Sequence, residues 1–333
     1  MAVRRESGIV SLFKKGYIFC DIDKEVDGPL HWAIQERQPE IALYLIQEGE
    51  DTNRLDSNQR SPLEVALEKE LFDVIKALVE NKADVNLLGV NNHSLLNRAL
   101  ELAMKKDYLD VFKALVDNKA DVNFVDATNI SILRKAVFEE KYEYVEVLIN
   151  AGANLKCVSP ANETLLHFAA LFGQRDIAKL LIKNGAEIDA KTNHLESPLH
   201  LACSQGRPEV VKLLLENGAS LNIKDVDSNE PIHYASALGR SQCLEILIQH
   251  GAHLNTRGGD SLTPLQMTIK GVSQNWPQPV LYKNRTVNAQ TLLNYGASFN
   301  SKDKRQLLER TMAKKNFDIF KLFVFFEPLT KWP

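Results

Sequence analysis

The feature that most constrains the fold of this chain is an internal period of 33 residues. A Pro-Leu pair, or an apolar pair in its place, begins at Pro29, Pro62, Leu95, Ile132, Leu165, Pro198, Pro231 and Pro264. Successive pairs lie 33, 33, 37, 33, 33, 33 and 33 residues apart. Each pair marks one repeat, and we number the repeats one to eight in chain order. Self-similarity at such a period is typical of solenoids, in which stacked units share one continuous core.

One unit of the repeat is clearest in Ser197–Asn222. Its two apolar-periodic segments are separated by Gly206 and end at Gly218. Ser197 followed by proline is typical of a helix N-cap with proline in the first turn, and glycine after a helix adopts the left-handed conformation without strain. The pattern predicts a helix, a turn, a second helix and an extended segment. Because one unit cannot bury both of its apolar faces, it needs neighbours.

The helix starts share a phrase that resembles the signature T-P-L-H-x-A of the ankyrin repeat family. The copies are GPLHWA (28–33), TLLHFA (164–169), SPLHLA (197–202), EPIHYA (230–235) and TPLQMT (263–268). An Ala-x-apolar-Asn phrase follows the second helix, as in Ala83–Asn86 and Ala252–Asn255. The resemblance implies an all-α ankyrin-repeat solenoid of about eight helix-turn-helix repeats, with β-turn fingers and terminal caps.

Three segments are expected from this register: an N-terminal cap (1–27), the ankyrin repeat array (28–300) and a C-terminal helical cap (301–333). Four extra residues in repeat three, 100–103, predict a first helix that is one turn longer. Repeat eight carries an insert at 271–286, which we expect to be an irregular loop because it contains Pro277 and Pro279. Gln59 and Leu195 replace a finger glycine of the family, so these finger tips are expected to deviate from the usual turn.

Composition excludes several classes of protein. A net charge of −3 implies no general attraction to nucleic acid, and no apolar run approaches the ~18 residues of a membrane span. Four cysteines without a CxxC spacing predict neither a disulfide framework nor a zinc site, and they favour a reducing compartment. The sequence therefore predicts a monomeric cytoplasmic protein without membrane insertion, located in the host cytosol if it is a secreted effector.

Four histidines, His31, His167, His200 and His233, occupy the same place in their repeats. The resemblance implies that each bonds backbone near the finger, and no carboxylate or cysteine recurs beside them at metal-ligand spacing. No nucleophile, zinc-protease or phosphate-loop motif is present. We expect no catalytic, metal or cofactor site. Asparagines recur after the second helices and are expected to bond local backbone: Asn53, Asn86, Asn123, Asn222, Asn255 and Asn300.

Partner contacts are expected where the repeat does not dictate the residue. The candidates are apolar residues near fingers (Leu88, Val90, Phe124, Val125), at first-helix ends (Phe138, Leu171, Phe172, Leu238) and in the insert (Trp276, Tyr282). The interpretation places Phe124, Phe138, Leu171 and Phe172 on adjacent parts of one face, as a hot-spot cluster would be. The alternative is that these side chains fill gaps between repeats, and that Trp276 covers the C-terminal helix.

The leading hypothesis is a non-catalytic scaffold that binds a protein through the concave face and fingers of repeats three to six. A narrower hypothesis is an effector that intracellular bacteria deliver into host cells, and a eukaryotic cytosolic adaptor is the alternative. The third is an enzyme with a cryptic site in the insert and the C-terminal region, where Arg285, Arg305, Glu309 and Arg310 are ionisable. The apolar helix expected at 317–326 either packs on repeat eight or is an exposed docking or membrane-touching segment.

Overall fold

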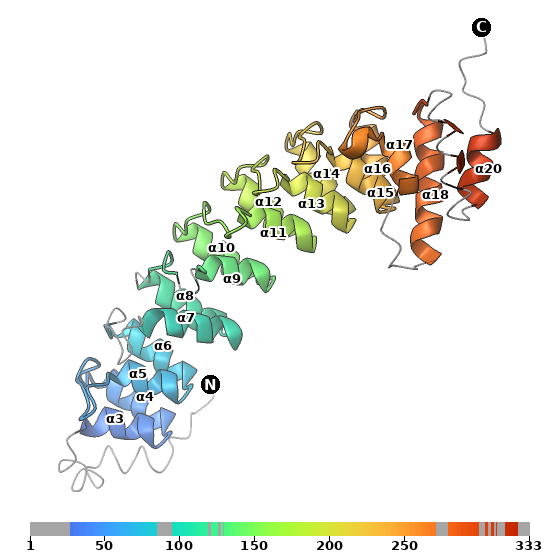
Figure 1. Ribbon diagram of the computed structural model, residues 1–333. Helices are drawn as coiled ribbons and strands as arrows, with labels where there is room; N and C mark the ends of the chain where they lie inside the picture. The colour runs from blue at the N-terminus through green and yellow to red at the C-terminus, as the bar shows by residue number, and fades with distance from the viewer. Residues whose placement is uncertain are drawn as a thin grey trace, which may run out of the picture. The chain divides into compact units, whose positions relative to one another are not determined.

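The computed structural model describes residues 27–84, 95–118, 121–125, 128, 130–270, 279–299, 304–305, 308–309, 311 and 317–325. The chain forms two compact units, which are divided between Asn154 and Leu155. We call residues up to 154 unit 1 and the residues from 155 unit 2. Each unit is built from helical pairs joined by short turns (Figure 1).

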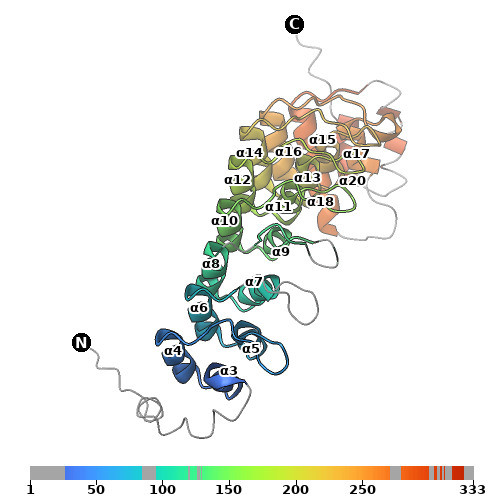
Figure 2. The ribbon, with the colours of Figure 1, turned by 90° about the vertical axis from the view of Figure 1, so that its left-hand side faces the viewer.

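Unit 1 stacks the helical pairs of repeats one to four. They are α3 (Gly28–Gln35) with α4 (Pro39–Gln47), α5 (Pro62–Glu68) with α6 (Phe72–Glu80), α7 (Leu95–Lys105) with α8 (Leu109–Asp117), and α9 (Ile132–Phe138) with α10 (Tyr142–Asn150). The first helices α3, α5, α7 and α9 pack in one layer, and the second helices α4, α6, α8 and α10 pack in another (Figure 2).

Unit 2 continues the same pairing through repeats five to eight. The pairs are α11 (Leu165–Phe172) with α12 (Arg175–Lys183), α13 (Pro198–Gln205) with α14 (Pro208–Glu216), α15 (Pro231–Ala237) with α16 (Ser241–Gln249), and α17 (Pro264–Lys270) with α18 (Pro279–Asn294). A short 3-10 helix, η1 (Gly259–Ser261), precedes α17, and α20 (Phe317–Phe325) packs against α18. The contact with α18 agrees with packing of the apolar C-terminal helix on repeat eight.

Burial of the repeated apolar positions holds these short helices together. Leu199, Ala202 and Cys203 of α13 are fully buried, as are Val210 and Leu214 of α14. Each fully buried leucine or valine side chain contributes about 1.5–3 kcal/mol. Most of the helices have only seven to nine residues, whereas isolated helices shorter than ~12–15 residues are marginal in water. Neighbouring repeats therefore supply the stability that one repeat lacks, and the predicted all-α repeat solenoid is confirmed.

The predictions for the two irregular repeats, three and eight, have different outcomes. The extended first helix of repeat three is confirmed, because α7 has 11 residues. The irregular loop predicted for the whole insert is wrong, because α18 begins at Pro279 and residues 279–286 belong to it. Proline is compatible with the first turn of a helix, where its missing N–H has no intrahelical partner. Residues 271–278, which include Trp276, lie outside the described residues.

The fingers of repeats two and six keep a left-handed tip although the tip residue is not glycine. Gln59 and Leu195 have φ values of 62° and 58°, so the expected deviation from the turn is wrong. The reason is a polar side chain three residues before each tip: Asp56 Oδ1 accepts two backbone N–H bonds across the turn, and Thr192 Oγ1 does the same. These bonds impose the turn and outweigh the preference of the tip residue for negative φ.

The strained tip in repeat six gives a test of this account. Leu195→Gly is expected to raise the free energy of unfolding by about 0.5–1 kcal/mol. The left-handed conformation costs an L-residue ~1–2 kcal/mol, and glycine removes this strain. The larger conformational entropy of glycine in the unfolded chain offsets part of that gain. Leu195→Val should lower it by about 1 kcal/mol, since a β-branched residue tolerates positive φ least. Urea unfolding measures both variants, and shifts in the same direction would contradict the strain.

Candidate functional site

The recurring histidines are buried, and Nε2 of His31, His167 and His200 each bonds a backbone carbonyl oxygen of the next finger. In repeat six, the backbone N–H of Ser197 donates to Nδ1 of His200 at 3.1 Å, and Nε2 lies 3.1 Å from the carbonyl oxygen of Asn229. Because Nδ1 accepts a hydrogen bond, Nε2 carries the proton and donates. His167 makes the same pair of bonds, to Thr164 and Glu196. The structural role expected of the histidines is confirmed at these positions.

Burial also decides the charge of three of these histidines, His167, His200 and His233. It lowers the pKa of His167, His200 and His233, and burial is the largest cause in each case. These three rings therefore stay neutral near pH 7, and those of His167 and His200 accept a hydrogen bond at Nδ1 and donate one from Nε2. Within the described residues, no group of three His, Cys, Asp or Glu side chains is arranged to hold a metal ion.

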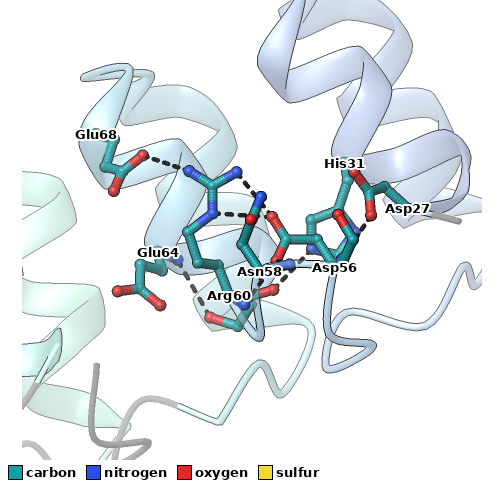
Figure 3. A network of polar contacts seen from close by, with 9 residues as sticks. Asp27, His31, Asp56, Asn58, Arg60, Glu64 and Glu68 are labelled. Atoms are coloured by element: carbon teal, nitrogen blue, oxygen red, sulfur yellow. Dashed lines mark hydrogen bonds and ion pairs between the residues drawn. The ribbon is translucent and has the colours of Figure 1, made fainter. Parts of the chain in front are cut away.

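Repeat two replaces this histidine with Glu64 and surrounds its finger with charged groups (Figure 3). Arg60 lies 2.8 Å from Asp56 and 3.0 Å from Glu68, and its carbonyl oxygen is bonded to Nε2 of His31. Burial alone would raise the pKa of Asp56, but its bonds to Arg60 and to backbone N–H groups outweigh burial and lower it. This network fixes the finger between the first two repeats.

Asn53, Asn123 and Asn255 bond the next repeat, so the expected local role is wrong at these three positions, whereas Asn86 and Asn300 lie outside the described residues. Oδ1 of Asn53 accepts from the backbone N–H of Asp84 at 2.6 Å, and its Nδ2 donates to the carbonyl oxygen of Lys82. Asn123 bonds Asn154 in the same way. Partners 31 residues away in sequence become neighbours only when repeats stack.

In unit 1 the predicted contact residues lie at two ends of one helix. Phe124 and Val125 begin the finger of repeat four, where Val125 pairs with Ser131 in an isolated β-bridge. Phe138 is 62% exposed at the last position of α9. A seven-residue helix is about 10 Å long, so Phe124 and Phe138 are not brought together. Leu88 and Val90 lie outside the described residues.

In unit 2 the predicted residues gather at the ends of first helices. Leu171 and Phe172 close α11, with Phe172 39% exposed, and the partly exposed Leu238 follows α15. Tyr282 lies in α18 rather than in a loop. Phe138 belongs to unit 1, so its place on one face with Leu171 and Phe172 stays a prediction.

Sequence inspection missed a carboxylate pair beside the first helices of unit 2. The hydroxyl of Tyr234 lies 2.6 Å from Oδ2 of Asp225 and 3.2 Å from Oε1 of Glu196. Burial is the largest cause that raises the pKa of this hydroxyl, and the two carboxylates add to it. For Glu196 a sequence signal was present, because Glu163 occupies the equivalent position 33 residues earlier, and each lies two residues before the start of a first helix.

The groups named for a cryptic enzyme do not form a constellation in the described residues. Arg305 and Glu309 face solvent as an i,i+4 ion pair, and Arg285 is buried in α18, whereas Arg310 lies outside the described residues. Burial raises the pKa of Cys203, and it raises that of Cys243 to about 11, so neither thiol is activated. No helix in the described part of the chain is long and apolar enough to cross a membrane.

Comparisons with known proteins agree with this architecture. A family model for ankyrin repeats (3 copies) matches residues 1–88, 100–192 and 191–258. The human transient receptor potential cation channel subfamily A member 1 is 31% identical over 78 residues, 23% of this chain and 7% of that protein. Mouse Rabankyrin-5 is 34% identical over 84 residues, 24% of this chain and 7% of that protein. The chain therefore matches only a small part of each relative.

A solved structure extends the likeness to most of the chain. The crystal structure of the human ASB11 ankyrin repeat domain matches with a TM-score of 0.54 and 26% identity, covering 72% of this chain and 100% of that one. Ankyrin repeats are generally protein-interaction modules, and their fold is typically non-catalytic. These matches agree with the 33-residue period, the paired helices and the recurring buried histidines. This chain belongs to the ankyrin repeat family.

Proposed function

We propose that this chain is a non-catalytic scaffold that binds a protein partner through the fingers and first-helix ends of repeats three to six. The observation that carries the proposal is one variable place at the end of the first helices. Five repeats fill it with different residues: Glu68, Phe138, Leu171, Ser204 and Ala237. Stacking therefore dictates no residue type there, so the exposed phenylalanine of repeat four can serve recognition.

Energetics favour a contact site that includes this place and Phe172, which follows it directly in repeat five. Phe138 and Phe172 expose much of their rings, and aromatic side chains that become buried at an interface centre supply most of the binding energy. Large exposed apolar groups are otherwise a liability for a soluble protein. We therefore propose that the protein is monomeric and cytoplasmic, so that this surface stays accessible to a protein partner.

The biological setting is the narrower part of the proposal. The described chain carries little besides repeats, and the finger tips depart from the glycine of the family. These features suit an effector that intracellular bacteria deliver to a host protein, and equally a eukaryotic cytosolic adaptor. Delivery into host cells, measured with the C-terminal tail present and removed, separates the two.

The contact site is tested with the double variant Phe138→Ala and Phe172→Ala. Affinity purification from cell lysate followed by mass spectrometry is expected to lose the specific interactors, because each truncated hot-spot residue costs about 1–4 kcal/mol of binding. The circular dichroism melt should stay nearly unchanged, since both side chains are exposed. If this folded variant retained all interactors, the assignment of Phe138 and Phe172 to the contact site would be wrong.

A matched control uses exposed apolar residues on another surface. Tyr295 follows α18 and is 54% exposed, and Val287 lies within α18. The variant Tyr295→Ala with Val287→Ala should keep the interactors that the phenylalanine variant loses. Equal loss in both variants would show that the purification reports general surface hydrophobicity instead of a site.

A further inference from the structure

The first helices of repeats five to seven form a layer without charged side chains. The sequences of α11, α13 and α15 contain no Asp, Glu, Lys or Arg, whereas α5 contains Glu64 and Glu68, and α9 contains Arg134 and Lys135. The three helices pack side by side (Figure 2). Their partly exposed residues, which we call the neutral face, are Leu171, Leu201, Ser204, Tyr234 and Ala237, with Leu238 directly after α15.

Carboxylates border this neutral face at its finger side. Glu163 and Glu196 are partly exposed and occupy the same place in consecutive repeats. The contact of Glu196 with the hydroxyl of Tyr234 places its carboxylate over α15, two first helices along from α11. Asp225 approaches the same hydroxyl from the following finger. The negative groups therefore lie against the neutral face and not apart from it.

This border holds negative charge that the protein does not neutralise. A tyrosine hydroxyl has one proton, and the shorter contact of 2.6 Å assigns it to Asp225. Oε1 of Glu196, at 3.2 Å, is the weaker acceptor of this proton, and a neutral hydroxyl leaves the negative charge of Glu196 in place. Within the described residues of unit 2, the ion pairs involve other carboxylates, Asp176, Glu216 and Glu309. A cation supplied by a partner would satisfy Glu196.

The spacing of the two glutamates defines the geometry of such a partner. Packed helices lie about 8–10 Å apart, so equivalent residues of consecutive repeats are separated by a similar distance. In a polyproline II segment, residues i and i+3 point to the same side and are about 9.3 Å apart. Two basic residues three positions apart thus match Glu163 and Glu196, and the residues between them meet the neutral face.

We propose that the neutral face of unit 2 docks an extended segment of the partner protein with arginines at positions i and i+3 and apolar residues between them. The proposal rests on the scaffold function above and names the chemistry of its partner. Arginine fits better than lysine, because a planar guanidinium can bond Glu196 and stack on the ring of Tyr234 at the same time. Apolar side chains of the segment then cover Leu201 and Leu238.

The test uses a fluorescein-labelled peptide, Ser-Pro-Leu-Arg-Pro-Leu-Arg-Pro-Leu-Ser, and fluorescence anisotropy with the full chain. A second peptide replaces both arginines with glutamates. We expect the arginine peptide to bind at least about tenfold more tightly, and its affinity to fall as the salt concentration rises from about 0.05 to 0.5 M, since salt screens exposed charges.

Two variants assign the charge dependence to the border. Glu163→Gln and Glu196→Gln should each weaken the arginine peptide about fivefold or more. Glutamine keeps an acceptor for Ser159 and Tyr234, so the fold is preserved. The matched control is Glu209→Gln on the second helix α14, an exposed carboxylate of the other layer, and it should leave the affinity unchanged.

Three outcomes would overturn the proposal: equal affinity of the two peptides, unchanged affinity in both glutamine variants, or no binding of the arginine peptide up to about 1 mM, the weakest affinity of interest. The scaffold function fails by a separate result, which is retention of interactors by the Phe138→Ala and Phe172→Ala variant. If that variant loses its interactors while both peptides bind alike, the scaffold stands and the charge complementarity is wrong.

Discussion

Replacing His200 with alanine is expected to lower the free energy of unfolding by about 3–5 kcal/mol. The imidazole is fully buried and bonds the N–H of Ser197 and the carbonyl oxygen of Asn229. Its removal leaves both backbone groups without their partner, at a cost of about 1–3 kcal/mol each. The cavity and the lost edge contact with the ring of Tyr234, at 5.7 Å between centroids, add to this. Urea unfolding followed by circular dichroism measures the loss.

A glutamine variant separates hydrogen bonding from general disruption. Repeat eight already uses glutamine at this place, where Oε1 of Gln266 accepts from the N–H of Thr263 at 2.9 Å. His200→Gln should therefore keep the capping bond and cost only about 1–2 kcal/mol. If the alanine and glutamine variants lose equal stability, the role assigned to the histidine bonds is wrong.

Acidification below pH 6.5 is expected to destabilise unit 2. The pKa values of His167, His200 and His233 are lowered by burial, so the unfolded chain takes up protons near its ordinary pKa of about 6.5 while the folded chain does not. Stability is full above pH 6.5 and is lost as the pH falls toward the lowered pKa values. Each histidine contributes a slope of at most about 1.4 kcal/mol per pH unit, hence about 4 kcal/mol per pH unit for three.

The pH effect is measured from urea unfolding midpoints at about pH 7.5 and pH 5.5, on either side of the ordinary histidine pKa. Carboxylates such as Asp56 and Asp107 have lowered pKa values and titrate below this window. The triple variant His167→Gln, His200→Gln and His233→Gln should be less stable at neutral pH but lose most of the pH dependence. Equal shifts of the midpoint in wild type and triple variant would contradict the assignment to these histidines.

Local patterns predicted the repeat because each signal acts within a few residues. Pro198 after Ser197 begins a helix, and Gly218, with φ of 88°, ends one. The same local reasoning was wrong at Leu195, where the side chain of Thr192 imposes a turn that the tip residue disfavours. It was also wrong at Pro279, because proline excludes a helix interior but not a first turn.

The candidate site depends on pairs that stacking creates. Tyr234 meets Glu196, 38 residues earlier, and Asn53 meets Asp84, 31 residues later. No local rule joins such residues, and their register appears only when equivalent positions of consecutive repeats are superimposed. Phe138 and Phe172 were predicted as partner contacts because repeats differ there, with packing between repeats as the alternative. Both side chains are exposed, and their role as contacts stays a prediction.

The central claim is that repeated positions hold the fold and variable positions bind the partner. The most direct test measures a urea unfolding curve and the retained interactors in the same two variants. We expect Phe138→Ala with Phe172→Ala to lose the interactors at an unchanged unfolding midpoint, and His200→Ala to lower the midpoint yet keep the interactors under conditions where it remains folded. The claim would be contradicted if the phenylalanine variant kept its interactors. It would also be contradicted if that variant lost them only because it had unfolded.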